Sequence, residues 1–463
     1  MANPCTCAVT ESFDIHPGYC RSRYPPCVDA TIANDLARLD RLPRWPWSKG
    51  LLVNLGGSFF FAFFDIVVIG AALPTITEQF GITSQEGGLA ITAGLVGLVI
   101  GSFIGAYLAT KHSRRMALQT ALWAFSFGML LSVFAPNLAW LIVARFIAGL
   151  GTGADIAIVV TYVAEISPQR ARGRITGFTT LCGYIGMAVV PFLAFIIIDD
   201  FTWGWRLLFA FGAMGAVVLV MTRRHMPLSP RHLADRGDAK QLGELVDQAE
   251  ARVTAQIGEL PPVPPPQAKE SPKFRARTWL IALFTVAWFF YYIGNYGWLT
   301  VAPTILTDNG FTVTASLGFI AAANCGLVVG ALVSYLLAEK VERKWLLIGT
   351  LVLWALALAG IGALGTSTAI MVLGFVAAFT IGLAVPIFYA YTSEHFSSHV
   401  RPWGMAWTDG LGHLGGAIAP YILIGLSLAS AFTAMALSGL VAAFLLLFTT
   451  KTKGKSLEEL SGD

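Results

Sequence analysis

The sequence predicts an all-α, polytopic membrane protein whose twelve transmembrane helices form two six-helix halves. Hydrophobic residues make up 56% of the chain and charged residues only 13%, and the mean hydropathy is +0.67. Soluble domains contain about 25% charged residues, and a single apolar core of this size would exceed that of an ordinary domain. Apolar stretches of about 20 residues, enough to cross a bilayer, recur along the chain, and the sequence repeats itself once.

Twelve apolar stretches are long enough to span a membrane. They lie at residues 50–72, 85–109, 116–135, 138–166, 174–198, 205–221, 279–303, 315–338, 345–364, 368–393, 403–427 and 429–449. All but two of the 31 lysines and arginines, the exceptions being Arg145 and Arg206, fall in the terminal tails or in every second loop. Basic residues are enriched in cytoplasmic loops, so we expect both termini in the cytoplasm and the helices in the plasma (inner) membrane. The net charge of +4 then reflects topology and does not indicate a nucleic-acid partner.

The chain divides into five segments: a cytoplasmic N-terminal tail (1–48), a first six-helix half (49–222), a central cytoplasmic loop (223–277), a second six-helix half (278–450) and a cytoplasmic C-terminal tail (451–463). The tail 1–48 lacks the apolar stretch of a cleavable signal peptide. The central loop is polar and contains PPVPPP at 261–266. This composition predicts a flexible linker with one stiff stretch.

Four of the six cysteines lie in the N-terminal tail, close to His16. Their spacing matches no regular zinc motif, so reduced thiols are favoured over a metal site. We therefore expect neither a metal nor a cofactor. These cysteines are Cys5, Cys7, Cys20 and Cys27.

A repeat relates the two halves at one fixed offset. Corresponding residues lie 229 positions apart, as Glu165 and Glu394 do. Other pairs are Pro74 and Pro303, Lys111 and Lys340, Tyr162 and Tyr391, Arg172 and Arg401, and Gly186 and Gly415. Because each half contains an even number of helices, both halves have the same orientation in the membrane. Proteins built in this way bind a substrate between the halves near the middle of the membrane, and the halves rock around that site.

Several motifs carry a family resemblance. RFIAGLGTGADIAIVVTYVAEISPQRARGR (145–174) resembles the helix-4 signature of the major facilitator superfamily, and AYTSEHFSSHVRPWG (390–404) resembles its echo in the second half. MPLSPRHL (226–233) resembles the Pro-Glu-Ser-Pro-Arg motif, with Leu228 in place of Glu, and RLDRLPRWPW (38–47) resembles the segment before helix 1 of metabolite symporters. The resemblance spans residues 40–455 and is closest to the sugar-porter and metabolite:proton symporter groups. It implies a secondary active transporter, not an enzyme.

The chain also departs from the family pattern between helices 2 and 3. Thr110 stands where the family has Asp, and Ser113 stands where it has Gly. In the second copy of this loop, Glu342 replaces the Gly. These differences affect the motif that, by resemblance, closes the cytoplasmic side of the first half, and they do not affect the predicted fold.

Three charged residues lie inside apolar stretches of the first half only. Asp65, Arg145 and Asp155 correspond at the offset to uncharged residues, although a charge at the centre of a membrane helix costs about 2.5–3.5 kcal/mol. Ten residues of helix separate Arg145 from Asp155 by about 15 Å, so Asp65 is the better partner for Arg145. The resemblance implies that Asp65 and Arg145 are the proton-coupling pair. Burial favours the neutral acid and a guanidinium favours the carboxylate, so the pair can take up and release a proton; the alternative is a static ion pair.

Asp155 and the glycines around it have separate interpretations. Asp155 is a candidate second proton-binding site, a contact for a substrate hydroxyl or amine, or a partly solvated acid. GLGTGA (149–154) superficially fits a dinucleotide fingerprint, which requires a strand before it and a helix after it. Because the motif lies within a transmembrane helix, close helix packing is favoured.

Polar and aromatic residues of the second half are candidates for substrate binding. The seventh stretch contains WFFYYIGNYGW (288–298), where the family lines its cavity; the alternative is core packing or interfacial anchoring. Asp409 and His413 lie four residues apart on one helix face, where they can relay protons, bind an anion or satisfy each other. The substrate-binding candidates are Tyr291, Tyr292, Asn295, Tyr296, Trp298, Asp409 and His413.

Charged residues at the cytoplasmic helix ends are candidates for a gate. By resemblance they form salt bridges between helices that close the cytoplasmic side; the alternative is a static surface network. These residues are Arg114, Arg115, Glu165, Arg172, Arg343, Lys344, Glu394 and Arg401.

The sequence therefore predicts a monomeric transporter in the lipid bilayer that imports a small organic metabolite with protons by alternating access. An organic or aromatic acid is the favoured substrate, and a sugar or polyol is the alternative. A drug-type exporter is disfavoured because CGYIGMAVVPF (182–192) lacks the Gly-Pro-x-x-Gly-Gly signature of that group. A transporter-like sensor is disfavoured because it would carry a long structured cytoplasmic domain, and the central loop is too rich in proline for one. A membrane enzyme is disfavoured because the sequence contains no cluster of catalytic residues.

Overall fold

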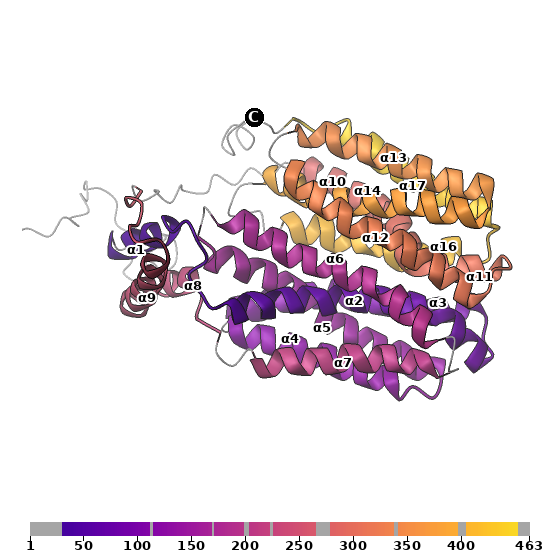
Figure 1. Ribbon diagram of the computed structural model, residues 1–463, viewed down its shortest axis with the longest axis horizontal. Coiled ribbons are helices and arrows are strands. Elements are labelled where there is room, and N and C mark those ends of the chain that lie inside the picture. The colour runs from indigo at the N-terminus through magenta and orange to yellow at the C-terminus, as the bar shows by residue number, and fades with distance from the viewer. Residues whose placement is uncertain are drawn as a thin grey trace, which may run out of the picture.

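The structure is a computed structural model that describes residues 30–111, 114–168, 171–198, 203–222, 226–264, 278–337, 341–396 and 404–451. Long helices run side by side in a bundle, with shorter helices outside one end (Figure 1). The first half, coloured indigo to magenta, lies beside the second half, coloured orange to yellow. The tail cysteines and His16 lie outside the described residues.

The first half contains six long helices. They are α2 (Lys49–Phe80), α3 (Ser84–Lys111), α4 (Arg114–Val133), α5 (Leu138–Ile166), α6 (Arg172–Ile197) and α7 (Gly204–Thr222). The second half contains α10 (Thr278–Tyr296), η2 (Gly297–Val301), α11 (Ala302–Asp308), α12 (Val313–Leu337), α13 (Arg343–Leu364), α14 (Ser367–Glu394), η3 (Ala406–Gly410), α16 (Leu411–Leu423) and α17 (Leu428–Leu446). Within the described residues, eleven helical spans are long and apolar enough to cross a membrane.

Two short π-helical segments interrupt the helices of the second half. η2 joins α10 to α11 in one continuous helical run, and η3 precedes α16. The expected helix at 403–427 is therefore present as η3 and α16, and the uninterrupted α-helix is too short to count as a twelfth span by itself. Such π-segments are rare and frequently lie at functional sites.

Equivalent glycines pack against equivalent backbone atoms in the two halves, as the repeat predicts. A Cβ on Gly153 of α5 would collide with the Leu98 carbonyl oxygen of α3, and a Cβ on Gly382 of α14 would collide with the Leu327 carbonyl oxygen of α12. In the GLGTGA motif, Gly149 also abuts the α3 backbone. The motif is thus a helix-packing surface, as expected, because only glycine permits this close approach.

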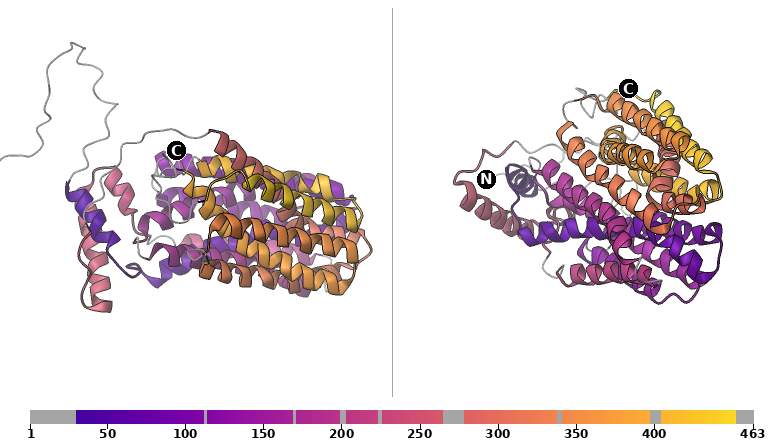
Figure 2. Two further views of the ribbon diagram at one scale, coloured as in Figure 1. Left: turned by 90° about the horizontal axis from the view of Figure 1, so that it is seen from above. Right: turned by 45° about the vertical axis from the view of Figure 1, so that its right-hand side comes forward.

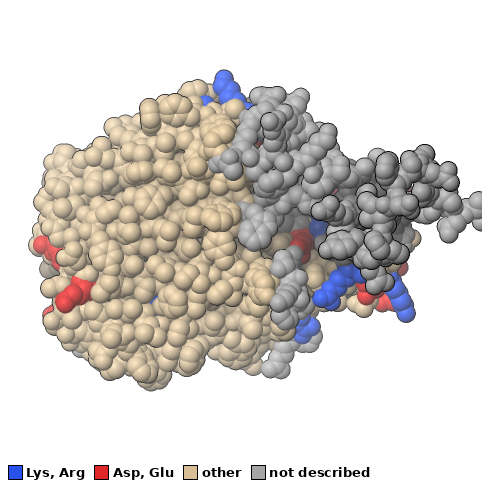
Figure 3. Space-filling view, turned by 180° about the vertical axis from the view of Figure 1, so that it is seen from behind, with Lys and Arg blue, Asp and Glu red and all other residues tan. Residues whose placement is uncertain are grey.

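The halves meet along two helix pairs, α3 with α16 and α6 with α12, and α2 also contacts η2 and α11. The Thr92 hydroxyl donates to the Ala417 carbonyl oxygen at 2.6 Å across the first of these pairs. Near the end of the bundle opposite the short helices, the Ser84 hydroxyl donates to Asp308 Oδ1 at 2.8 Å. Between the two ends, the visible face is a belt almost without charged residues (Figure 3), as a lipid-facing surface requires.

The short helices form a group that we call the platform: α1 (Ala30–Asp40), α8 (Pro230–Asp235) and α9 (Ala239–Ile257). Figure 2 shows this group outside the end of the bundle in two further views. The prediction of a flexible linker is therefore wrong over residues 230–257. The polar and proline-rich composition of the loop did not indicate the amphipathic helix α9. The buried apolar residues of α9 are Leu242, Val246, Ala249 and Val253.

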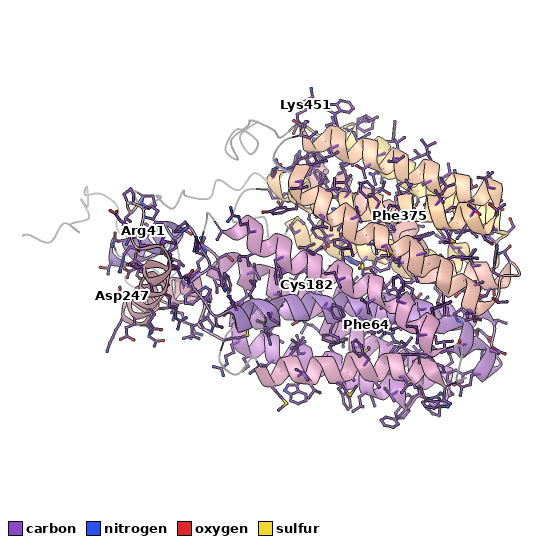
Figure 4. The ribbon with its side chains drawn as sticks, viewed as in Figure 1. Arg41, Phe64, Cys182, Asp247, Phe375 and Lys451 are labelled. Atoms are coloured by element: carbon purple, nitrogen blue, oxygen red, sulfur yellow. The ribbon has the colours of Figure 1, made fainter. Side chains whose placement is uncertain are left out.

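Ion pairs join α1 to α9 within the platform. Arg41 Nη2 lies 2.7 Å from Glu250 Oε1, and Arg38 Nη2 lies 2.7 Å from Glu250 Oε2 and 2.5 Å from Asp247 Oδ1. Figure 4 labels Arg41 and Asp247 in this group. These acids raise the pKa of the Arg38 guanidinium, so Arg38 stays positively charged. The Trp47 indole N–H donates to the Ile166 carbonyl oxygen at 2.9 Å and so attaches the platform to α5.

Candidate functional site

Asp65 of α2 and Arg145 of α5 form a buried ion pair. Arg145 Nη1 donates to Asp65 Oδ1 at 2.5 Å, and Arg145 Nη2 donates to the Asp65 carbonyl oxygen at 3.2 Å. The Thr152 hydroxyl donates to Asp65 Oδ2 at 2.9 Å. Both side chains of the pair are only 3% exposed. The pairing is the one expected from the sequence, and both carboxylate oxygens of Asp65 have a partner.

Beyond this pair, the Arg145 side chain has few polar contacts. Its guanidinium lies 5.6 Å from the Phe209 ring centroid, and Nη1 lies 3.5 Å from Met129 Sδ. Nε is buried without a hydrogen-bond partner. The pair borders a small, mainly apolar cavity of about 10 Å³, enough for about one water molecule. A charge in such surroundings depends on its counter-ion, because little else nearby solvates it.

Asp155 lies one turn beyond Thr152 on α5 and is also buried. The Ser58 hydroxyl of α2 donates to Asp155 Oδ2. Asp155 and Arg145 are not bonded to each other, as their separation along the helix predicts. Two buried acids therefore lie where α2 meets α5: Asp65 of α2 is paired with Arg145 of α5, and Asp155 of α5 is bonded to Ser58 of α2.

A second polar cluster lies in the second half, where η3 meets α10, α14 and α16. Asp409 Oδ1 accepts hydrogen bonds from the Tyr292 hydroxyl at 2.6 Å and from the Tyr389 hydroxyl at 2.8 Å. The His413 ring lies 4.2 Å from the Tyr292 ring, and the Tyr296 ring lies 5.8 Å from that of His413. The structure thus brings together four of the seven residues that the sequence proposed for substrate binding, namely Tyr292, Tyr296, Asp409 and His413.

The remaining aromatic candidates are engaged in the protein interior. Asn295 Nδ2 donates to the Tyr291 hydroxyl at 2.9 Å, and both residues are buried. The Trp298 indole N–H donates to Asn324 Oδ1 at 3.2 Å, and its ring lies against Gly374 of α14. These contacts match the alternative of core packing.

The family comparison decides the identity. Residues 50–463 match the Sugar (and other) transporter family. The protein belongs to the major facilitator superfamily, in its sugar-porter group. It is therefore a multi-pass membrane transporter, and the family and fold are not those of an enzyme.

Three relatives resemble this transporter over most of their length. The putative metabolite transport protein YyaJ of Bacillus subtilis (strain 168) is 28% identical over 430 residues, which are 90% of this chain and 95% of that protein. The niacin transporter NiaP of Acinetobacter baylyi (strain ATCC 33305 / BD413 / ADP1) is 28% identical over 440 residues, 92% and 99% of the two chains. The gallate transporter of Pseudomonas putida is 27% identical over 409 residues, 83% and 88%.

The fold is that of a solved transporter. The partially occluded inward open structure of the xylose transporter XylE from E. coli matches with a TM-score of 0.71 and 20% identity, covering 89% of this chain and 99% of that chain. At this identity the match supports the architecture and not the substrate.

The expected cytoplasmic gate is only partly visible in the transporter. Arg343 Nη1 lies 2.9 Å from Glu394 Oε1, and both residues belong to the second half. Glu165 Oε2 accepts a hydrogen bond from the Ser229 hydroxyl at 2.6 Å, next to the platform. The side chains of Arg114, Arg172 and Arg401 lie outside the described residues, and Arg115 lies half-buried in the first turn of α4.

Lys344 differs from the expectation. Its Nζ donates to the Leu447 carbonyl oxygen at 2.9 Å and to the Thr449 carbonyl oxygen at 2.6 Å. Lys344 therefore holds the C-terminal end of α17 and does not pair with a gate acid. The last carbonyls of a helix lack partners within the helix and attract a cation, which accounts for the difference.

Three further polar residues belong to these sites. Ser58 and Thr152 each lie seven residues, about two helical turns, from Asp65 and Arg145 respectively, so helical spacing could have found them. Tyr389 reaches Asp409 from a different helix. Nothing in the local sequence of α14 indicates that contact.

Proposed function

We propose that the transporter imports a small organic acid, favouring an aromatic carboxylate, together with protons across the plasma membrane. The observation that carries this proposal is the buried Asp65–Arg145 pair, which exists in one half only. An ion pair that merely held helices together would not require this asymmetry. The protein works as a monomer with both termini and the platform in the cytoplasm, in keeping with the basic residues of that end.

The pair can couple a proton to an anion through charge alone. When Asp65 binds a proton, Arg145 loses its counter-ion but keeps the hydrogen bond to the Asp65 carbonyl oxygen. The local charge then becomes positive, which favours an anionic substrate between the halves. Each ligand therefore strengthens the binding of the other, as coupling requires. Release of the substrate restores the preference of Asp65 for its charged form.

Two observations support an aromatic acid as the substrate. The niacin and gallate transporters are relatives with nearly full-length coverage. The cluster of Tyr292, Tyr296 and His413 offers flat rings beside polar groups, a surface suited to an aromatic ring. The sugar or polyol alternative is favoured by Asp155 and Asp409, whose carboxylates can accept hydrogen bonds from hydroxyls, and by the likeness to XylE.

At the cytoplasmic end, we propose that Glu165, Arg343 and Glu394 belong to the gate. Ser229 of the platform holds Glu165 in the conformation described here. Lys344 is not part of this proposal.

Purified protein in proteoliposomes tests the function. Initial uptake of radiolabelled nicotinate, benzoate and xylose is measured with an acid exterior, and uptake by protein-free vesicles is subtracted because neutral weak acids cross bilayers unaided. We expect nicotinate or benzoate uptake that accelerates with the imposed gradient and slows with a protonophore. Gradient-driven uptake of xylose alone would establish the sugar alternative. Uptake of any probe that ignores the gradient would contradict proton coupling.

A further inference from the structure

One carboxylate oxygen of Asp409 accepts no hydrogen bond from any described residue. Oδ1 accepts both tyrosine hydroxyls, whereas Oδ2 has no hydrogen-bond partner in the described part of the chain. The side chain is 19% exposed. No described lysine or arginine forms an ion pair with it. Asp409 is thus an acid inside the membrane with a free acceptor atom and without a permanent counter-ion.

His413 lies beside this acid with its tautomer set by the backbone. His413 Nδ1 lies 2.8 Å from the Asp409 carbonyl oxygen and 3.7 Å from Asp409 Oδ1. A carbonyl oxygen only accepts, so Nδ1 carries the hydrogen and Nε2 is the atom that can gain or lose a proton. Besides His413, the titratable groups that face Asp409 are the hydroxyls of Tyr292 and Tyr296 from α10 and of Tyr389 from α14.

The cluster adjoins the contact between the two halves. η3 packs against α3 of the first half. Trp407 lies 6.3 Å from Phe103 between ring centroids, and a Cβ on Gly410 would lie 3.8 Å from the Ser102 hydroxyl. The two α3 residues in these contacts, Ser102 and Phe103, carry no ionisable group. Rocking of the halves would change the exposure of Asp409.

We propose that Asp409 is a second proton-binding site, in the half opposite the Asp65–Arg145 pair, and that its protonation admits an anionic substrate. The proposal rests on the function proposed above. A hydronium ion on the acid side gives its proton to Oδ2: one O–H bond of hydronium breaks, one O–H bond forms on Asp409 and a water molecule remains, and the reverse step releases the proton to water. The neutral acid no longer repels a carboxylate, while the tyrosine hydroxyls stabilise the charged form after release. A permanently charged acid would be costly here, and a permanently neutral acid would not need two donors.

Infrared difference spectroscopy tests the site without any substrate. The difference between spectra of the protein in lipid vesicles at low and high pH should contain, beside the band of Asp65, a protonated-carboxyl C=O component that is lost in Asp409→Asn and persists in Asp155→Asn. Tyr389→Phe removes one donor to the charged form, so the pH midpoint of the band should rise by about one unit. An Asp409→Asn spectrum identical to wild type would overturn the proposal. If Asp409→Asn fails to fold, an unchanged midpoint in Tyr389→Phe would overturn it as well.

Uptake kinetics separate this proposal from the proposed function. With nicotinate as the probe, log KM plotted against pH should have a slope of about two in wild type and about one in either Asp409→Asn or Asp65→Asn, since the slope counts the protons bound with the substrate. A wild-type slope of about one that vanishes in Asp65→Asn would refute the second site while leaving proton coupling intact. Absence of any acid transport would instead refute the proposed function, and the infrared band would still decide the role of Asp409.

Discussion

Replacing Asp65 by asparagine should uncouple the transporter without removing its ability to exchange substrate. Asparagine keeps the shape and one carbonyl oxygen of the side chain but cannot carry the proton. Acid-driven net influx should therefore fall to the level of protein-free vesicles. Counterflow, in which labelled substrate exchanges for unlabelled substrate, needs no change in protonation and should persist.

The same substitution has a stability cost that follows from the structure. It leaves the Arg145 guanidinium buried without a counter-ion, with only neutral partners: the backbone and amide oxygens of residue 65, Met129 and Phe209. Breaking one side of a buried ion pair costs about 3–5 kcal/mol, whereas neutralising both sides is often nearly neutral. Asp65→Asn should therefore unfold at lower temperature than wild type, and Asp65→Asn combined with Arg145→Gln should recover most of the loss without regaining coupling.

Thermal unfolding in detergent and paired influx and counterflow assays measure the two effects. Acid-driven influx in Asp65→Asn would refute the assignment of the coupling acid. A double variant as unstable as the single variant would refute the claim that the unpaired guanidinium is the source of the cost. Loss of both influx and counterflow in a well-folded Asp65→Asn protein would show that Asp65 serves substrate binding.

Further predictions concern packing, the platform and Asp155 of α5. Gly153→Leu should abolish folded protein in size-exclusion chromatography, because its side chain meets the α3 backbone, whereas Gly349→Ala, with no atom within 4 Å of the new Cβ, should behave as wild type. Glu250→Gln removes the charge that pairs with Arg38 of α1 and with Arg41 just after it, and should cost about 1–3 kcal/mol in thermal unfolding, less at high salt. Glu244→Gln on the same helix is the control, and equal losses in both would contradict the ion-pair account. Asp155→Asn should raise KM about tenfold, the value of one hydrogen bond to a charged group, and leave gradient-driven uptake in place; loss of driven uptake at saturating substrate would make Asp155 a coupling acid instead.

Fold and repeat could be predicted because membrane insertion constrains the sequence strongly. Each span must hide its backbone in a helix, so apolar length alone locates the spans within a few residues. The offset was visible partly because glycines such as Gly186 and Gly415 meet the backbone of a neighbouring helix, where no other residue fits. The platform escaped prediction because its helix α9 is polar on average and is stabilised by α1, more than 200 residues earlier in the chain.

The Asp65–Arg145 pair of the candidate site was predictable because a buried charge in the membrane requires a counter-ion. Arg145 required an acid within reach, and few residues of the first half qualify. Tyr389 was not predictable, because its contact with Asp409 depends on how α14 and η3 pack, and many sequences would place a tyrosine there for the ring alone. The contacts of Lys344 were not predictable for a related reason: backbone carbonyls just beyond α17 compete with carboxylates for a lysine, and the sequence of a motif does not show them.

The two halves share one sequence pattern but differ in what interrupts their helices. Positions 297–301 and 406–410 are π-helical, whereas the positions 229 residues earlier, 68–72 and 177–181, lie within the α-helices α2 and α6. The first half instead carries the ion pair between two helices that glycines hold close to their neighbours. Interfaces of this kind switch between discrete arrangements and do not deform continuously. On the proposals above, the proton that changes the charge of the first half at Asp65 has its complement in the second half at Asp409, which lies in η3 beside the contact with α3.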